Sequence, residues 1–410
     1  MLTLDRRSMV GGALLAPAAL AMPRLARAAT TTLPPAIGQA ERLARLAKAR
    51  ALMRREGLGA ILVEPGASLD YFTGVRWSRS ERLTAALIPS SGDPIIVTPF
   101  FEKPSVAESL GIPAEIRTWD EHEEPLRLVA GWLRERKLAG APIGIEETNR
   151  FFIVDRLKAE LPRLALRNAN AVVRGCRMFK SPAEIALMQT ASDITVAAIR
   201  DTHAKLREGM TPDEISALLE ANMVARGGTS PWALVLLGEA SAYPHGSGKP
   251  QAVKRGEVVL IDTGCAFRGY QADISRSFVF GADPTREQRR VWEQVAQGQK
   301  IAMQAARLGA TAGSVDDAVR AAYTRWGYGP DYKLPGLSHR TGHGIGMEGH
   351  EPVNLVRGET TRLAPGMCFS NEPGLYLPGK FGIRLEDCFH MTAAGPRYFS
   401  TPPASIDAPV

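Results

Sequence analysis

The chain has 410 residues, which is long enough for two domains with their own cores. Hydrophobic residues make up 45% and charged residues 23%, as in ordinary globular proteins, and no apolar run beyond the N-terminus approaches the ~18 residues of a membrane span. A net charge of +7, with basic and acidic residues interleaved, argues against a nucleic-acid-binding protein. Four cysteines without a CxxC pair argue against a disulfide framework and a thiolate zinc site.

Residues 1–28 have the three parts of an export signal in order. The pair Arg6 and Arg7 precedes the apolar run Val10–Met22, and Ala26–Ala28 supplies small residues around a cleavage site. The paired arginines favour the twin-arginine route over an ordinary Sec signal. We therefore expect a periplasmic protein whose mature form has no membrane span.

An α/β domain is expected over residues 39–172, after a Thr- and Pro-rich flexible lead-in at 29–38. Short apolar runs of strand length alternate with helical stretches, a pattern typical of α/β domains. The clearest segments are a helix at 39–56, strands at 60–63, 85–88 and 95–98, and a helix at 125–138. This domain contains no obvious catalytic constellation.

An α+β domain is expected over residues 173–410. Ser181 and Thr211 begin capping boxes with proline at the first helical position, and Thr285 and Ser314 are expected to begin two further helices. The β-rich runs lie at 232–237, 257–263, 272–280, 367–376 and 382–391. Grouped helices with hairpin-like strands indicate the α+β class.

Two aspartates in this domain have a spacing along the chain that would let their carboxylates lie close together. Asp262 is expected to end a buried strand, and Asp273 follows it eleven residues later, across a turn. Two adjacent strands would bring both carboxylates together, and because they repel one another they need protons or cations. On its own, such a pair of aspartates more often belongs to a loop or turn and has no functional role.

A glycine-rich segment carries three of the seven histidines, His339, His343 and His350. Glycine lets the backbone approach a ligand closely, and neutral imidazole is the commonest nitrogen ligand of metals. The alternative is a surface loop with solvated histidines.

Two glutamates, Glu372 and Glu386, lie in strand-like apolar segments, where a carboxylate is costly unless it is paired or bound to metal. A salt bridge between Glu386 and Arg384 is the alternative, but residues two apart on a strand are poorly placed to pair. With Asp262, Asp273 and His343 these glutamates form an oxygen-rich set with one nitrogen, which suits manganese, cobalt or zinc. Four carboxylates are too many for one catalytic zinc, so two divalent ions are expected.

The ordered motifs resemble those of the pita-bread metallopeptidases, which include methionine aminopeptidase, aminopeptidase P and Xaa-Pro dipeptidase (prolidase). The resemblance covers about residues 175–400 and rests on Asp262, Asp273, the GHG at 342–344, the EPG at 372–374 and the RLED at 384–387. The segment 39–170 resembles the creatinase-type N-terminal domain of the Xaa-Pro branch. The resemblance also implies a homodimer.

This resemblance implies a role for each metal ligand. Asp262 would bind one ion, Asp273 and Glu386 would bridge both ions, and His343 and Glu372 would bind the other. A metal-bridging hydroxide would be the nucleophile, with manganese the first choice of metal and cobalt or zinc as alternatives. Glu372 would also carry the proton to the leaving amine.

The resemblance places further residues around the substrate. His245, in a PHG motif, and His350 would donate to the substrate and its oxyanion, and His339 falls at a proline-pocket position. Arg384 would orient Glu386 or contact the substrate. Arg357 is a candidate for binding a dipeptide carboxylate, although a solvated loop arginine is the more common situation.

Two departures from the family pattern stand out. Gly349 replaces the bulkier residue expected before His350, which could alter the pocket wall. Cys368 and Cys388 could pair in an oxidising compartment, but cross-strand geometry favours free buried thiols.

The predicted function is metal-dependent hydrolysis of the Xaa-Pro bond in dipeptides or short peptides. Proline removes the N–H group that general proteases use and restricts its neighbour, which is a reason for a specialised enzyme. One alternative is a metal-using hydrolase or lyase of a small non-peptide metabolite on the same fold. Another is a non-catalytic peptide-binding relative, against which the complete ligand set argues.

Overall fold

The computed structural model describes residues 33–410. The expected export signal and residues 29–32 of the lead-in lie outside this range, and residues 33–38 are neither helix nor strand. Within the described range, no helix combines the length and apolar character that a membrane crossing requires.

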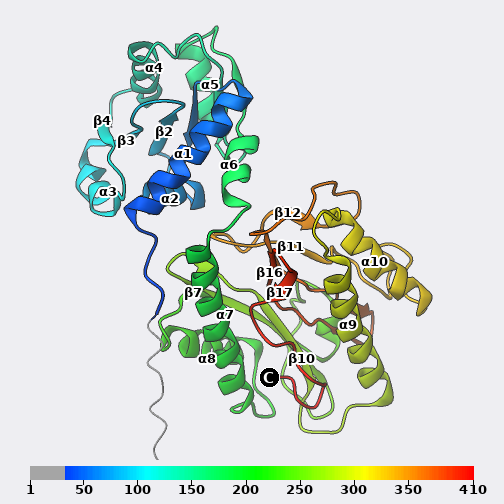
Figure 1. The fold of residues 1–410 in the computed structure, drawn as a ribbon. Coiled ribbons are helices and arrows are strands. Elements are labelled where there is room, and N and C mark those ends of the chain that lie inside the picture. The colour runs from blue at the N-terminus through cyan, green and yellow to red at the C-terminus, as the bar shows by residue number, and fades with distance from the viewer. Residues whose placement is uncertain (1–32) are drawn as a thin grey trace, which may run out of the picture. The chain divides into compact units, whose positions relative to one another are not determined.

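The N-terminal domain is a mixed six-stranded sheet, in the order β4-β3-β2-β1-β5-β6, between two layers of helices (Figure 1). Strand β1 is antiparallel to β2 and parallel to β5. The strands are β1 (Ala60–Val63), β2 (Ala85–Pro89), β3 (Ile95–Pro99), β4 (Glu115–Trp119), β5 (Ile143–Ile145) and β6 (Leu166–Asn168). The helices are α1 (Gln39–Glu56), α2 (Ala67–Thr73), α3 (Lys103–Ser109), α4 (Pro125–Glu135), α5 (Phe151–Glu160) and α6 (Asn170–Arg177).

Strands β1, β2 and β3 are buried on both faces of the sheet, which explains why they are continuous apolar runs. In β1, Ile61 and Val63 pack in a core with α1, α2 and α6, whereas Ala60 and Leu62 face α4 and α5. The expected α/β class is thus confirmed.

Helix α6 lies across the boundary expected between residues 172 and 173. A boundary between residues 172 and 173 would divide α6, whose residues Val172, Val173 and Cys176 pack in one core with Leu46 of α1. The apolar face of α6 therefore belongs to the N-terminal domain, and the connection to the next domain follows Arg177.

The C-terminal domain contains two helix pairs and several antiparallel sheets. The helices are α7 (Pro182–His203), α8 (Pro212–Val224), α9 (Arg286–Ala305) and α10 (Ala312–Arg325). The longer strands are β7 (Thr229–Leu237), β8 (Val258–Phe267) and β10 (Ile274–Val279), with β9 (Tyr270–Gln271) beside β8. The remaining strands are β11 (Gly342–Gly344), β12 (Glu351–Leu355), β13 (Cys368–Phe369), β14 (Leu375–Leu377), β15 (Phe381–Ile383), β16 (Phe389–Thr392) and β17 (Gly395–Tyr398).

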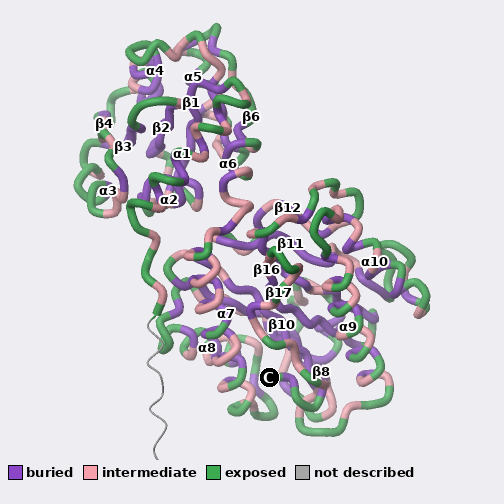
Figure 2. Tube along the Cα trace, in the orientation of Figure 1, coloured by how far each residue is buried: buried purple, intermediate pink, exposed green. Residues whose placement is uncertain are grey.

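Each helix pair covers its own part of the domain core. One core packs α7 and α8 against β7, β8 and β10, and the other packs α9 and α10 against the strands that follow residue 342. Figure 2 shows the buried, purple trace along β8 and β10. The metal-ligand candidates lie within or beside strands of both groups, so the packing of these strands positions the site.

Three of the four expected helix starts are confirmed. Ser181, Thr211 and Thr285 each form a capping box with the residue three positions later. The fourth was wrong, since α10 begins at Ala312 and its N-cap is Thr311. Ser314 lies inside the first turn, where its hydroxyl donates to the Thr311 carbonyl instead of capping.

Strand boundaries near the expected ligands also differ. Strand β8 does not end at Asp262 but continues to Phe267, because β7 pairs with it on one side and β10 and β9 on the other. Glu372 and Glu386 lie in extended segments between strands and not within strands. Their placement depends on long-range pairing, which local sequence patterns do not reveal.

Candidate metal centre

The five predicted ligands converge at one place. Ligand atoms of Asp262, Asp273 and Glu386 lie within 4.8 Å of one another, as do those of His343, Glu372 and Glu386. The hairpin register explains the aspartate pair, because Ser275 of β10 lies opposite Asp262 and Asp273 directly precedes this strand. The expected meeting of the two aspartates is confirmed.

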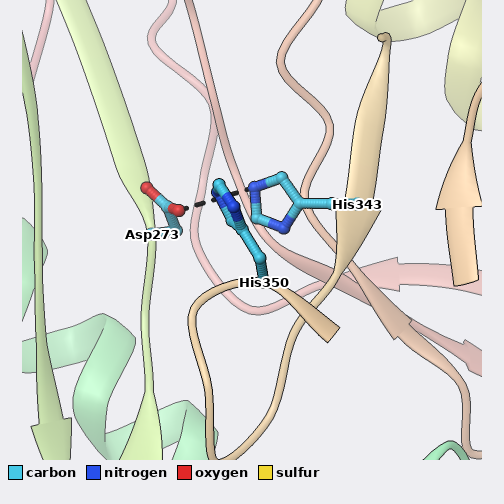
Figure 3. Close-up of side chains that lie close together, drawn as sticks. All are labelled: Asp273, His343 and His350. Carbon is cyan, nitrogen blue, oxygen red and sulfur yellow. Dashed lines mark ion pairs between the residues drawn. The ribbon is translucent and has the colours of Figure 1, made fainter. Parts of the chain in front are cut away.

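His343 directs one ring nitrogen at the carboxylates. Its Nδ1 donates to the Gly344 carbonyl at 3.0 Å, which leaves the lone pair on Nε2 free to bind a cation. Nε2 lies 3.3 Å from Glu372 Oε1 and 3.6 Å from Asp273 Oδ2, and Figure 3 shows the aspartate contact. Burial is the main cause that holds the pKa of His343 well below 6.5, and the nearby His350 lowers it further. The imidazole of His343 is therefore neutral.

The carboxylates cannot all be charged without cations. Burial raises the pKa of Asp273 and Glu386 well above ordinary values, and repulsion from neighbouring carboxylates adds to this effect. Burial likewise raises the pKa of Glu372 to about 7, against the opposing effect of Arg384. Within residues 33–410, the buried Asp273 Oδ1 and Glu386 Oε1 have no hydrogen-bond partner. Buried unpaired carboxylate oxygens beside a neutral imidazole fit a divalent metal centre.

Ser275 and Arg384 hold two of the ligands in place by hydrogen bonds. The Ser275 Oγ lies 2.9 Å from Asp262 Oδ1 and 2.8 Å from Glu386 Oε2, and it accepts a hydrogen bond from Arg384 Nε at 3.0 Å. Arg384 also donates to Asp262 Oδ2 at 2.6 Å. The arginine therefore pairs with Asp262 and not with its chain neighbour Glu386, which excludes the local salt bridge considered from the sequence.

A cavity of about 980 Å³ opens onto these ligands. Besides the five ligands and Arg384, its lining includes the predicted residues His245, His339 and His350. Trp232 and Leu234 of β7 add an apolar wall. The combination of polar groups at one end and apolar side chains nearby is typical of a small-molecule site.

His339 is held as a neutral hydrogen-bond acceptor. Its Nδ1 donates to the Arg340 carbonyl at 2.7 Å, so Nε2 accepts from the Tyr376 hydroxyl at 2.7 Å. Burial, together with the nearby Arg384, lowers the pKa of His339 to about 3. Arg384 in turn donates to the Tyr376 hydroxyl at 3.2 Å, which links His339 to the metal-ligand support.

His350 and Gly349 lie at the cavity wall. Figure 3 shows the His350 ring beside that of His343, with ring centroids 4.1 Å apart. A Cβ atom built on Gly349 would meet nothing within 4 Å, so this position leaves open space next to His350. Whether the glycine alters the pocket wall stays a prediction.

Arg357 is the one predicted site residue that the structure does not bring to this cavity. It is exposed, and its guanidinium pairs with Asp317 at 2.9 Å and with Asp331. A substrate-binding role for Arg357 therefore finds no support in its position.

Several residues of the site were missed from the sequence. Arg340 lines the cavity, Ser275 contacts the ligands Asp262 and Glu386, and Tyr376 contacts His339 and Arg384. The position of Arg340 within the histidine segment was a usable signal. Ser275 could be found only from the hairpin register, and Tyr376 only from tertiary contacts.

The four cysteines are all buried free thiols. Cys368 lies opposite His390 in the strand register, and the Cys388 thiol donates to the Asp273 carbonyl at 3.2 Å. The preference for free thiols over a Cys368–Cys388 bridge is thus confirmed.

Family comparisons agree with this geometry. Residues 186–393 match metallopeptidase family M24, and residues 45–179 match the creatinase/prolidase N-terminal domain. The chain belongs to metallopeptidase family M24. It therefore belongs to a family of metal-dependent peptidases, and the two-domain architecture of a creatinase-type domain followed by a pita-bread domain is confirmed.

Relatives cover nearly the whole chain. The probable dipeptidase PepE of Mycobacterium tuberculosis is 33% identical over 86% of this M24 chain and 92% of that protein. The Xaa-Pro dipeptidase of Lactobacillus helveticus is 31% identical over 81% of this chain and 90% of that protein. The crystal structure of dipeptidase PepE from Mycobacterium ulcerans has a TM-score of 0.81 at 32% identity, covering 90% of this chain and 98% of that chain.

Proposed function

We propose that this M24 metallopeptidase uses two divalent metal ions to hydrolyse the bond before proline in dipeptides or short peptides. The observation that carries the proposal is the buried ligand set, in which unpaired oxygens of Asp273 and Glu386 lie with the free Nε2 of His343. The relative from Lactobacillus helveticus is named an Xaa-Pro dipeptidase, which supports the choice of substrate.

The residues divide into metal ligands and groups that serve the substrate. Asp262, Asp273, His343, Glu372 and Glu386 would hold the ions. When bound, the ions would lower the pKa of a coordinated water and polarise the scissile carbonyl. We propose manganese as the native metal because hard carboxylate ligands predominate, with cobalt and zinc as alternatives.

Proton transfer falls to Glu372 and oxyanion stabilisation to two histidines. The Glu372 carboxyl faces the cavity, where it can take a proton from the attacking water and return it to the leaving proline nitrogen. His245 and His350 line the same cavity and can donate to the oxygen that becomes negatively charged. Arg384 keeps Asp262 in place through its 2.6 Å contact.

The test uses mature protein that has been stripped of metal and then restored with manganese. We expect cleavage of Ala-Pro or Ala-Pro-Ala and much slower cleavage of Ala-Ala. His343→Ala should lose metal stoichiometry and activity together, whereas Arg325→Gln, a change at an exposed position on α10, should alter neither. Cleavage of Ala-Ala alone, or of no peptide, would reject the substrate and leave a non-peptide substrate or a binding role.

Export and assembly are separate proposals. We propose twin-arginine export to the periplasm from Arg6, Arg7 and the apolar run that follows them, and a homodimer from the family resemblance. Cell fractionation tests the first, and light scattering of the purified protein tests the second. A cytoplasmic product with residues 1–28 retained, or a monomer at all concentrations, would contradict them.

A further inference from the structure

The acid that follows the ligand Glu386 belongs to a second buried network. Glu386 lines the metal cavity, and because neighbouring residues on an extended segment point to opposite sides, the buried Asp387 points away from it. Asp387 Oδ1 accepts hydrogen bonds from Arg276 Nη2 at 2.7 Å and from the Ser400 hydroxyl at 2.5 Å. Its Oδ2 accepts from Gln299 Nε2 at 3.3 Å. Both oxygens of Asp387 are thus bound by protein groups, which sets this carboxylate apart from the metal ligands.

Arg276 joins Asp387 to two segments that carry ligands. Its guanidinium is buried, and Nη1 donates to the Glu386 carbonyl at 2.8 Å and to the Ser275 carbonyl at 3.0 Å. Ser275 lies two residues after the ligand Asp273. One guanidinium therefore holds the backbone next to both carboxylates that we expect to bridge the metal ions.

Gln299 of α9 extends the network to the segment of Glu372. Its Nε2 donates to the Asn371 carbonyl at 3.1 Å as well as to Asp387. Its backbone carbonyl accepts from Asn371 Nδ2 at 3.0 Å, and Asn371 directly precedes Glu372. The network thus reaches segments that carry three of the five ligands.

The segments of Glu372 and Glu386 need such support because no regular sheet ladder holds them. Residues 371–374 and 384–388 are neither helix nor strand. The backbone hydrogen bonds that Asn371 and Asp387 exchange are 3.2 and 3.4 Å long, against about 2.9–3.0 Å for most N–H···O bonds. Charged ligand carboxylates also repel one another, which favours separation of the segments.

The ion pair between Arg276 and Asp387 is better explained by positioning than by stability. A buried ion pair often adds nothing to stability compared with apolar residues of similar volume, because both charges lose their hydration. Its directional hydrogen bonds, however, fix the positions of the groups that they join. Here those groups include the backbone carbonyl of a metal ligand, at 2.8 Å from the guanidinium.

We propose that Arg276, Asp387 and Gln299 form a positioning network that holds Glu372 and Glu386 in the arrangement that binds the metal ions. The three residues act through the backbone of the ligand-bearing segments and contact neither metal nor substrate. This inference rests on the proposed function, of which it uses only the two-metal site.

The experiment is a calorimetric titration of metal-free protein with Mn²⁺, for the unmodified chain, Asp387→Asn and Gln299→Met. Asp387→Asn removes the charge opposite Arg276, and we expect Mn²⁺ affinity to fall by about ten- to a hundredfold, as for other groups that support metal ligands. Gln299→Met keeps the length of the side chain without its donor and should cost about tenfold. Because it leaves the ion pair intact, Gln299→Met tests the network even where Asp387→Asn does not fold.

A conservative variant of the arginine gives a graded result. Arg276→Lys keeps a positive charge beside Asp387 but loses the planar fork that reaches the carbonyls of Ser275 and Glu386. Its Mn²⁺ affinity should lie between that of the unmodified chain and that of Asp387→Asn. An affinity equal to that of the unmodified chain would remove the two carbonyl contacts from the network and overturn the role of Arg276.

Glu64→Gln is the matched control that separates positioning from stability. Glu64 is also a buried acid, and it pairs with Arg150 of the N-terminal domain at 2.7 Å. This variant should lower Tm but keep the Mn²⁺ affinity. All titrations are run well below the Tm of every variant, where nearly all of the protein is folded, so lost stability by itself leaves the measured affinity unchanged.

The outcomes that contradict the network differ from those that contradict the proposed function. Unchanged Mn²⁺ affinity in both Asp387→Asn and Gln299→Met would overturn the network, and so would an equal loss in Glu64→Gln. If the variants lose affinity as expected but the unmodified chain cleaves no peptide, the peptidase function fails and the network stands. If the unmodified chain binds no Mn²⁺, the metal site fails and the network fails with it.

Discussion

Replacing Ser275 by alanine tests whether the hydroxyl behind the ligands positions them for metal. Ser275 is fully buried on β10, and its Oγ lies within 3.0 Å of atoms from Asp262, Glu386 and Arg384. Alanine removes one oxygen and leaves a space too small to rearrange the strand. The change therefore isolates the hydrogen bonds from the packing.

The magnitude follows from the groups left without a partner. Arg384 Nε is buried and Ser275 is its hydrogen-bond acceptor, so the variant leaves a charged donor unsatisfied, which costs about 1.5–3 kcal/mol. If this free-energy cost destabilises the positions that Asp262 and Glu386 take when metal is bound, metal affinity drops by about ten- to a hundredfold. Substitutions of groups that support metal ligands typically have effects of about this size.

The assay is a calorimetric titration of metal-free protein with Mn²⁺, for the unmodified chain and for Ser275→Ala. Ser192→Ala, a buried serine on α7, is the matched control and should keep the original affinity. Stoichiometry should remain two ions in all three proteins, with only affinity changed in Ser275→Ala. An unchanged affinity in Ser275→Ala would refute the reasoning, because the hydroxyl would then not hold the ligands.

Two further predictions concern stability. In metal-free protein the pKa of Glu372 is raised from 4.5 to about 7, so its stabilising contribution is complete below pH 4.5 and is lost as pH rises through about 7. The Tm of metal-free protein should fall between pH 5 and 8 and recover on adding Mn²⁺, whereas a Tm that rises over this range without metal would contradict the burial argument. Asp316→Ala breaks the buried pair with Arg320 and should lower the free energy of unfolding by about 3–5 kcal/mol in denaturant titration. Asp317→Ala, at an exposed neighbour, should cost less than about 0.5 kcal/mol, and equal losses in both variants would refute the assignment.

The sequence alone determined features that depend on local chemistry. A capping box needs only residues three apart, so the starts of α7, α8 and α9 were predictable. The ligand set was also predictable, because carboxylates in apolar segments beside a histidine-rich loop need a cation to offset their burial. The α10 start shows the limit of this approach, because the local pattern favoured Ser314, whereas the helix begins at Ala312 with Thr311 as its N-cap.

Tertiary structure decided which polar groups serve the site. Arg340 and Arg357 are both arginines in polar segments, yet one lines the cavity while the other pairs with surface aspartates. Ser275 reaches the ligands only because β10 pairs with β8, and Tyr376 joins the site through its hydrogen bonds with His339 and Arg384. Spacing along the chain specifies residue types and their order, but the direction and partners of a side chain depend on which distant strands pack against it. For this reason the metal ligands, the three cavity histidines and Arg384 were predictable from the sequence, whereas the contacts of Ser275, Tyr376 and Arg340 emerged only from the fold.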